Sequence, residues 1–137
     1  MVVALPSLHP MAQGKRDAAF PLRQLARDSF ILYGPPGTGL YDETVAACRA
    51  AGFSPHIGQQ APRITSTLGL VAAGLGIALV PESMQSMSMD GLVYRRLKGA
   101  PQPKAVLGLA SRRGDPSAVV RQFLNLVKRA AKVHSID

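Results

Sequence analysis

The residues best placed to do chemistry gather in a glycine-rich stretch, GPPGTG, at positions 34–39. A phosphate-binding loop has the pattern G-x-x-x-x-G-K-[ST], in which the lysine neutralises phosphate charge and the hydroxyl holds Mg²⁺. Gly34 and Gly39 have the required spacing, but Leu40 and Tyr41 stand where the lysine and the hydroxyl should follow. An apolar side chain cannot neutralise a triphosphate. A nucleotide-binding protein is therefore the least favoured of the alternatives for this loop.

Side chains for catalysis do not gather elsewhere in the sequence. His9 and His56 have no acid or nucleophile nearby, and Ser7, Ser29 and Ser66 lack the G-x-S-x-G frame of a nucleophile elbow. No pair of carboxylates has the arrangement that acid–base catalysis needs. We therefore predict that the protein is not an enzyme, and that it has no catalytic residues, no metal site and no cofactor.

The composition is that of a folded protein with a basic surface. The chain has 137 residues, of which 47% are hydrophobic and 5% aromatic, and a net charge of +8. Ten of its 16 Lys and Arg residues follow Gly91, scattered over predicted strands, turns and a helix, without a helix-turn-helix, a zinc finger or an aromatic stacking platform. We interpret them as a solvated surface, with a weak electrostatic role near DNA as the alternative. The single cysteine, Cys48, excludes an internal disulfide and is expected to be a small buried helix residue.

The amino-terminal stretch and the apolar runs indicate the compartment. MVVALPSLHP has no basic region of the kind that opens an export signal, and Pro6 interrupts it. The longest apolar run, Leu68–Pro81, contains three glycines and is too short to cross a bilayer. We therefore expect a cytoplasmic protein without membrane contact.

The glycine-rich stretch lies in an alternating pattern of strands and helices. The expected elements are a strand over Ser29–Tyr33, a helix from Thr38 or Gly39 to about Ala51, a strand over His56–Gln60, a helix capped by Thr65 or Ser66, and a strand over Ile77–Val80. Such βαβαβ units form parallel sheets with right-handed crossovers.

The flanking segments predict further elements. Val2–Leu5 reads as a strand, residues 7–28 as loops with one helical turn, and Glu82–Gly91 as a linker. Two more strands are expected, over Leu92–Leu97 and Lys104–Ala110. A final helix should begin with Asp115 as its cap, run to about Ala131 and rest its apolar face on a sheet; that face comprises Val119, Val120, Phe123, Leu124 and Val127.

Ligands of parallel sheets bind beyond the carboxyl ends of the strands. Two connections fall at that edge, Gly34–Gly39 and Ala61–Ser66, and each leads into a helix whose first N–H groups are unpaired and carry partial positive charge. Two such helix starts suit a small anion such as a carboxylate, aided by the hydroxyl groups of Thr38, Thr65 and Ser66. The alternatives are that Thr65 and Ser66 act only as caps and that Tyr41 packs against the core.

Three stretches resemble the effector-binding domain of LysR-type transcriptional regulators: ALPSLHPMA at 4–12, FILYGPPGTGLYDETVAACRAAGFSP at 30–55 and TLGLVAAGLGIALVPESMQ at 67–85. The resemblance covers nearly the whole chain. It implies an α/β fold like a type 2 periplasmic binding protein, in which two lobes hold a small effector between them. Residues 29–84 would form one complete parallel-sheet lobe, residues 1–28 and 91–137 part of the other, and residues 85–90 the crossover linker.

The same resemblance implies the binding residues and the function. The effector would contact Gly37, Thr38, Gly39, Leu40 and Tyr41 in one loop, Thr65 and Ser66 at the second helix start, and Ser7 near the hinge. The effector is expected to be a small organic acid, with aromatic acids included. The family's helix-turn-helix and the opening of the first lobe are missing from the pattern, so we expect a truncated gene, a misplaced start or a fragment.

This departure from the family pattern limits the expected partners. DNA would be contacted only through a helix-turn-helix absent from this chain, and the uncovered apolar surface predicts self-association as a dimer or higher. The alternative function is an interaction remnant that pairs with an intact regulator and binds no ligand.

Overall fold

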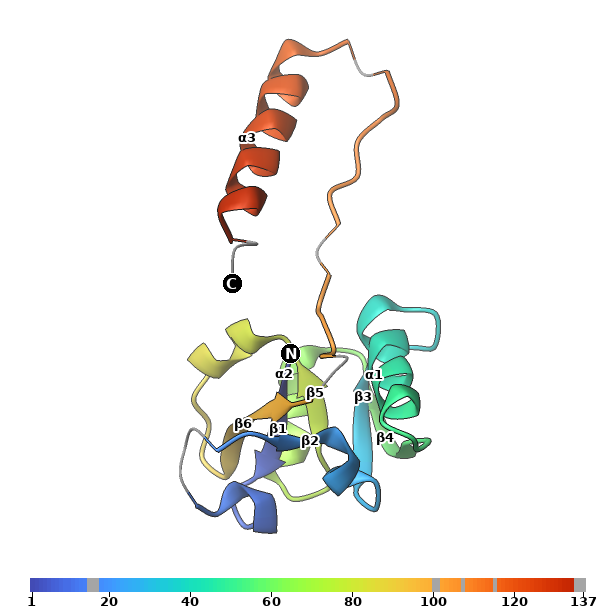
Figure 1. Ribbon diagram of the computed structural model, residues 1–137, viewed down its shortest axis with the longest axis vertical. Coiled ribbons are helices and arrows are strands. Elements are labelled where there is room, and N and C mark those ends of the chain that lie inside the picture. Colours follow the sequence, from blue (N-terminus) through green and yellow to red (C-terminus); the bar gives the residue numbers. More distant parts are fainter. Residues whose placement is uncertain (15–17, 100–101, 107, 115, 135–137) are drawn as a thin grey trace. The chain divides into compact units, whose positions relative to one another are not determined.

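A computed structural model describes residues 1–14, 18–99, 102–106, 108–114 and 116–134. The chain forms two compact units, Met1–Val106 (unit 1) and Leu107–Asp137 (unit 2), shown in Figure 1. The strands of unit 1 are β1 (Val2–Pro6), β2 (Phe20–Pro21), β3 (Ser29–Tyr33), β4 (His56–Ala61), β5 (Ala78–Val80) and β6 (Leu92–Lys98). Its helices are α1 (Gly39–Ala50), α2 (Ile64–Ala72) and the short 3-10 helices η1 (Pro10–Ala12), η2 (Leu22–Leu25) and η3 (Glu82–Ser86), while unit 2 contains α3 (Ala118–His134).

The strands of unit 1 form two connected sheets. Four strands lie in the order β2-β6-β1-β5, with β1 antiparallel to both β5 and β6, and β3 pairs in parallel with β4. A parallel bridge between Phe30 and Ile77 joins the sheets. Its hydrogen bonds run from Ile31 N to Ile77 O at 2.8 Å and from Ile77 N to Ser29 O at 2.9 Å. β3 therefore has neighbours on both sides, β4 and the residue that leads into β5.

The central strands bury side chains on both faces. One core cluster contains Val3 and Leu5 of β1 with Phe30 and Leu32 of β3, and the alternate residues of these strands belong to the second cluster. This is the period of two expected of a strand. Strands that are covered on both faces need continuous apolar runs, and VVAL and FIL are such runs.

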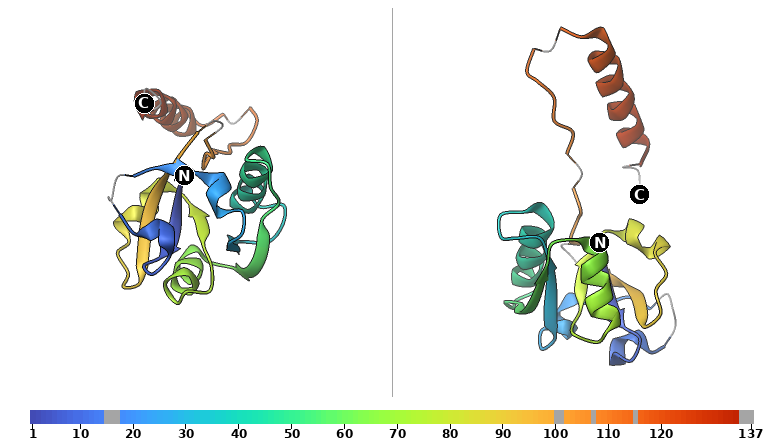
Figure 2. Two further views of the ribbon diagram at one scale, coloured as in Figure 1. Left: turned by 60° about the horizontal axis from the view of Figure 1, so that its bottom comes forward. Right: turned by 180° about the vertical axis from the view of Figure 1, so that it is seen from behind.

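The two longer helices of unit 1 cover opposite faces of β3. Cys48 of α1 belongs to the cluster that contains Phe30, whereas Leu68 and Val71 of α2 belong to the cluster that contains Ile31. Figure 1 shows α1 beside β3 and β4, and the right-hand view of Figure 2 shows α2 on the side that faces the viewer. The result is a helix–sheet–helix arrangement, which is how α/β proteins cover a sheet.

Gly76 allows the turn from α2 into β5. Its φ is +155°, and a Cβ atom there would lie 2.5 Å from the backbone oxygen of Ser29. No other residue tolerates so close a backbone contact. The glycine at this position therefore permits the bridge between the two sheets.

The third strand of the expected βαβαβ unit pairs differently from the prediction. β5 leaves β3 after one parallel bridge and pairs antiparallel with β1, in the register Val2–Val80 and Ala4–Ala78. The expected linker at residues 85–90 connects β5 to β6, and both of these strands are neighbours of β1 in one sheet. The division into residues 29–84 on one side and 1–28 with 91–137 on the other stays a prediction, while the contacts group Met1–Val106 into one unit.

One expectation for the carboxyl-terminal part of the chain was wrong. The described residues of the expected strand Lys104–Ala110, which are 104–106 and 108–110, have no strand structure. The expected cap Asp115 lies outside the described residues. The helix begins at Ala118, and the hydroxyl of Ser117 accepts a hydrogen bond from Val120 N at 3.4 Å, as a serine cap does.

Candidate functional site

The two predicted binding loops lie side by side. Tyr33, the last residue of β3, pairs with Ala61, the last residue of β4, and Gly34 N donates a hydrogen bond to Ala61 O at 2.9 Å. We call the residues that follow these strands, 34–41 and 62–66, the rim. The two turns therefore open at the same edge of the sheet, as the sequence predicts.

The first loop of the rim is held by hydrogen bonds within the loop, to the first turn of α1 and to β4. The Thr38 hydroxyl donates to Pro35 O at 2.7 Å, and Gly37 N donates to the carboxylate of Asp42 at 3.1 Å. Gly34 O accepts from the side-chain amide of Gln60 at 2.6 Å. Asp42 sits in the first turn of α1, where a negative charge is favoured by the helix dipole. The loop is therefore preformed.

The first turn of α1 offers three backbone donors. Its first helical hydrogen bond runs from Asp42 N to Thr38 O at 3.0 Å, and Thr38 makes no side-chain cap bond. The N–H groups of the preceding residues, 39–41, therefore lack helical acceptors.

The first turn of α2 repeats this arrangement with a different cap. α2 begins at Ile64 with Arg63 as its cap, and the first helical hydrogen bond runs from Thr67 N to Arg63 O at 3.0 Å. The prediction that Thr65 or Ser66 caps the helix was wrong by up to three positions, since both lie within the first turn. Their side chains are exposed, and the N–H groups of residues 64–66 lack helical acceptors.

The predicted residues differ in exposure. Gly37 and Gly39 are exposed, like Thr65 and Ser66, whereas Thr38, Leu40 and Tyr41 are half-buried. Tyr41 packs against the larger core cluster and also lines a recess of about 500 Å³ between α1 and β4. Tyr41 thus has the packing role that was the alternative to a ligand contact, while it still borders the rim.

The structure separates Ser7 from the other predicted residues. Ser7 follows β1, which runs antiparallel to β5, and its N–H donates to Gly91 O at 2.8 Å. β5 in turn runs parallel to β3. The end of β1 therefore lies at the edge where β3 and β5 begin, opposite to the rim. The start of β1 lies at the rim edge instead, where the Met1 amino group donates to Pro103 O at 3.0 Å.

The sequence did not predict the role of two residues that hold the rim. Gln60 and Asp42 contact the loop only because the chain brings β4 and the first turn of α1 against it. An acidic residue four positions after Thr38 is a recognisable signal for Asp42. A glutamine in a polar strand gives no such signal for Gln60.

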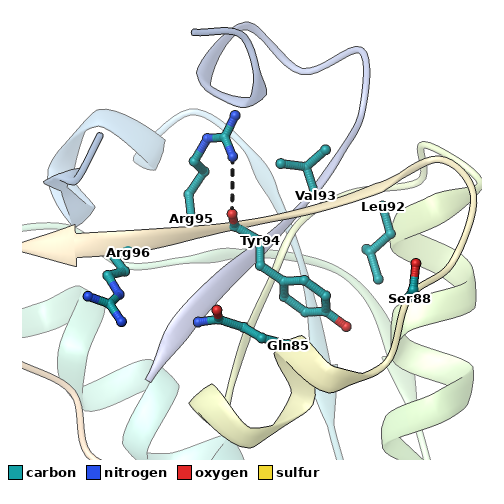
Figure 3. A pocket seen from close by; sticks show the side chains of 7 residues that line it. All are labelled: Gln85, Ser88, Leu92, Val93, Tyr94, Arg95 and Arg96. Atoms are coloured by element: carbon teal, nitrogen blue, oxygen red, sulfur yellow. Dashed lines mark hydrogen bonds between the residues drawn. The ribbon is translucent and has the colours of Figure 1, made fainter. Parts of the chain in front are cut away.

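A second recess lies between η3 and β6 and contains none of the predicted residues. Its volume is about 470 Å³, and it is lined by Gln85, Ser88, Leu92, Val93, Tyr94, Arg95 and Arg96 (Figure 3). In Figure 3, Tyr94 and Arg96 point to one side of β6 and Arg95 points to the other.

Both arginines of this recess already have acceptors. The Arg95 guanidinium donates to Ala12 O and, at 3.3 Å, to Tyr94 O, and Arg96 forms an exposed ion pair with Glu82 at 3.1 Å. An anion in this recess would have to compete with those acceptors. The rim, whose backbone donors lack helical acceptors, is the better candidate for an anionic ligand.

The titratable groups indicate no nucleophile. Burial raises the pKa of the Cys48 thiol to about 12 and also raises the pKa of the Tyr94 phenol. A neutral, buried thiol does not react as a nucleophile. Across the described ranges, no three His, Cys, Asp or Glu side chains gather to hold a metal ion, and no helix is both long and apolar enough for a membrane span.

Known proteins of similar sequence are regulators. Residues 1–132 match the family described as LysR substrate binding domain. The chain is 35% identical over 135 residues to the HTH-type transcriptional regulator CatR of Pseudomonas putida, covering 96% of this chain and 44% of that protein. It is 32% identical over 127 residues to BudR of Raoultella terrigena, covering 92% and 42%. The chain thus spans less than half the length of these relatives.

Solved structures of similar fold include effector-binding domains of regulators. The BenM effector-binding domain with its effector benzoate matches with a TM-score of 0.75 and 26% identity, over 99% of this chain and 61% of that one. The effector-binding domain of QuiR in complex with shikimate matches with a TM-score of 0.72 over 97% and 61%; its identity of 22% supports the fold alone. These likenesses confirm the predicted α/β fold of the periplasmic-binding-protein kind.

Proposed function

The chain belongs to the family of LysR substrate-binding domains, and from this premise we propose that its rim binds a small organic acid as part of the effector site of a transcriptional regulator. The observation that carries the proposal is the meeting of two helix starts at one edge of the sheet. Tyr33 and Ala61 pair at the ends of their strands, so the unpaired N–H groups of residues 39–41 and 64–66 belong to neighbouring turns.

The chemistry of the rim favours a carboxylate with one negative charge. Backbone N–H groups at a helix start bind anions without a cationic side chain. The carboxylate of Asp42 already accepts from Gly37 N in this loop, and its charge opposes a ligand with several negative charges. Benzoate, the effector named for BenM, and shikimate, the ligand of QuiR, are both ring compounds with one carboxylate.

The wider role follows from the relatives. These are transcriptional regulators rather than enzymes, and some are named HTH-type. We propose that an effector on the rim modulates transcription by changing how the domain associates with copies of itself and with the rest of a regulator. DNA would be read by a helix-turn-helix rather than by the residues described here.

The test is a titration of the chain with small carboxylates. We expect millimolar benzoate or shikimate to shift the backbone NMR signals of residues 37–41 and 64–66, and to raise the melting temperature. The matched control is benzyl alcohol, which keeps the ring but lacks the charge. Signals that move equally with benzyl alcohol, or signals that stay fixed with every acid, would count against the proposal. The second result, joined to concentration-dependent association, would favour an interaction module instead.

The threonine hydroxyls of the rim provide a second test. The double variant Thr38→Val with Thr65→Val should lower the carboxylate-dependent melting shift. It removes the exposed Thr65 hydroxyl from the start of α2 and the Thr38 hydroxyl whose bond to Pro35 O holds the loop before α1. The matched control is Thr67→Val, whose buried hydroxyl donates to Arg63 O at 3.2 Å and does not face a ligand. An unchanged melting shift in the double variant would show that these hydroxyls do not contribute to ligand binding.

A further inference from the structure

Gln60 makes the one side-chain hydrogen bond between the rim loop and β4 among the described residues. It is the second-last residue of β4, and its Nε2 donates to Gly34 O at 2.6 Å across 26 positions of sequence. Gly34 N is bound at the same time to Ala61 O at 2.9 Å. Both polar backbone atoms of Gly34 are therefore fixed by two consecutive residues of β4.

Gly34 is the point at which the loop takes its direction. It is buried, its φ is +76°, and a Cβ atom there would lie 2.8 Å from the Thr38 hydroxyl oxygen. The left-handed backbone turns the chain away from β3, and the close contact places Thr38, the residue before α1, directly over the glycine. A change in the orientation of the Gly34 peptide would therefore move the first turn of α1.

We propose that Gln60 is a positioning residue for the effector site, because its amide holds the Gly34 peptide and thereby keeps the start of α1 in register with the start of α2. The inference rests on the proposed function of the rim. α2 follows β4 directly, with Pro62 and Arg63 between them. A bond from β4 to the loop before α1 therefore sets the distance between the two groups of backbone donors.

The chain offers a matched control beside this residue. Gln59 is the adjacent glutamine of the same strand, is exposed like Gln60, and pairs with Ile31 in the ladder. Successive strand residues point to opposite faces, so Gln59 is directed away from the face that Gln60 presents. Both are replaced by leucine, which has a similar volume and no hydrogen-bonding group.

The experiment has one readout without ligand and one with it. In the free protein, Gln60→Leu should increase the fast motion and the hydrogen exchange of the backbone amides of Gly34 and residues 37–41, whereas Gln59→Leu should leave them as in the wild type. The NMR titration with benzoate should then show affinity reduced about threefold to tenfold in Gln60→Leu, the range expected for one hydrogen bond. Gln60→Lys, which restores an N–H donor of similar reach, should recover part of the affinity.

The outcomes separate this inference from the proposed function. If the wild type and Gln59→Leu bind benzoate and Gln60→Leu binds equally well, the positioning role is wrong while the proposed function stands. Unchanged motion of residues 34–41 in Gln60→Leu overturns the inference as well. If neither the wild type nor Gln59→Leu responds to any carboxylate, the proposed function fails and the positioning role fails with it.

Discussion

Phe30 and Phe123 each lie in an apolar pattern, Phe30 in a strand of unit 1 and Phe123 in the helix of unit 2. Phe30 is 0% exposed in β3, whereas Phe123 is 55% exposed in α3. Val119 and Leu126 of α3 are exposed by 73% and 64%. In unit 1, residues of β1, β5 and α1 belong to the core cluster that contains Phe30, while α3 has no second element within the described part of its own unit.

An apolar pattern thus determines the type of element but not whether its apolar side chains are buried. The spacing of Val119, Val120, Phe123, Leu124 and Val127 predicts a helix with one apolar face, and the helix is present. Burial needs a second surface of matching shape, and for β3 that surface comes from β1, β5 and α1. Stability should therefore depend on unit 1 far more than on the apolar face of α3.

The largest expected effect tests this comparison directly. Phe30→Ala should lower the free energy of unfolding of unit 1 by about 3–5 kcal/mol, because it empties a fully packed site. Phe123→Ala should change it by less than about 0.5 kcal/mol, as exposed substitutions do. Urea unfolding followed by the NMR signals of unit 1 measures both. Equal losses of stability in the two variants would show that Phe123 is packed as tightly as Phe30.

An intermediate effect is expected from Cys48, which lies in the core of unit 1. Burial raises its pKa from 9.0 to about 12, so the thiol stays neutral in the folded protein while the unfolded thiol ionises above pH 9. Its contribution to stability is complete below pH 9 and is lost as the pH rises toward 12. The slope of the loss is at most about 1.4 kcal/mol per pH unit.

The measurement for Cys48 is a difference between two proteins. Cys48→Ala lacks the thiol but retains the other groups that titrate in alkali, so the wild-type stability minus the variant stability should fall between pH 9 and pH 12. Urea unfolding at several pH values gives this difference. A flat difference would mean that the thiol is solvated in the folded state, and that the core of unit 1 is more open than its packing indicates.

A smaller effect is expected within the rim, where Thr38 and Thr65 occupy corresponding places before and within the two helix starts. Thr38→Val should lower the free energy of unfolding by about 1 kcal/mol, because the Thr38 hydroxyl donates to Pro35 O at 2.7 Å. Thr65→Val should change it by less than about 0.5 kcal/mol, since the Thr65 side chain is exposed. Thermal melting of the single variants measures the two effects. A larger loss for Thr65→Val would show that α2 depends on a cap at that residue.

Much of the local structure could be predicted from the sequence. β3 has the predicted bounds, Ser29–Tyr33, and α1 and β4 end within one residue of their predicted ends. Apolar runs bounded by glycine and proline carry these signals, and they act within a few residues of the chain. The glycine-rich loop and its place before a helix were predictable for the same reason.

The pairing of the outer strands was not predictable in this way. VVAL is apolar at every position, which indicates a strand covered on both faces but does not indicate which strands lie beside it in the sheet. β1 lies between β5 and β6. In each pair of facing residues, such as Ala4–Ala78 and Ala4–Tyr94, the two partners are more than 70 residues apart in sequence. Ser7 was expected near the hinge, as a further effector contact, from the family resemblance alone. Its place at the edge opposite to the rim depends on the direction of β1, which no local pattern indicates.

Neighbouring residues of the sequence suffice to indicate the family, the start of α1 and the absence of a lysine from the GPPGTG loop, because each of these is a local pattern. Only the tertiary structure decided that Tyr33 meets Ala61, that Gln60 holds Gly34 and that Ser7 lies at the opposite edge. The physical reason is that strand direction and strand order depend on which distant surfaces fit together. A local pattern indicates that an apolar surface must be buried, but the packing of the whole chain determines which element buries it.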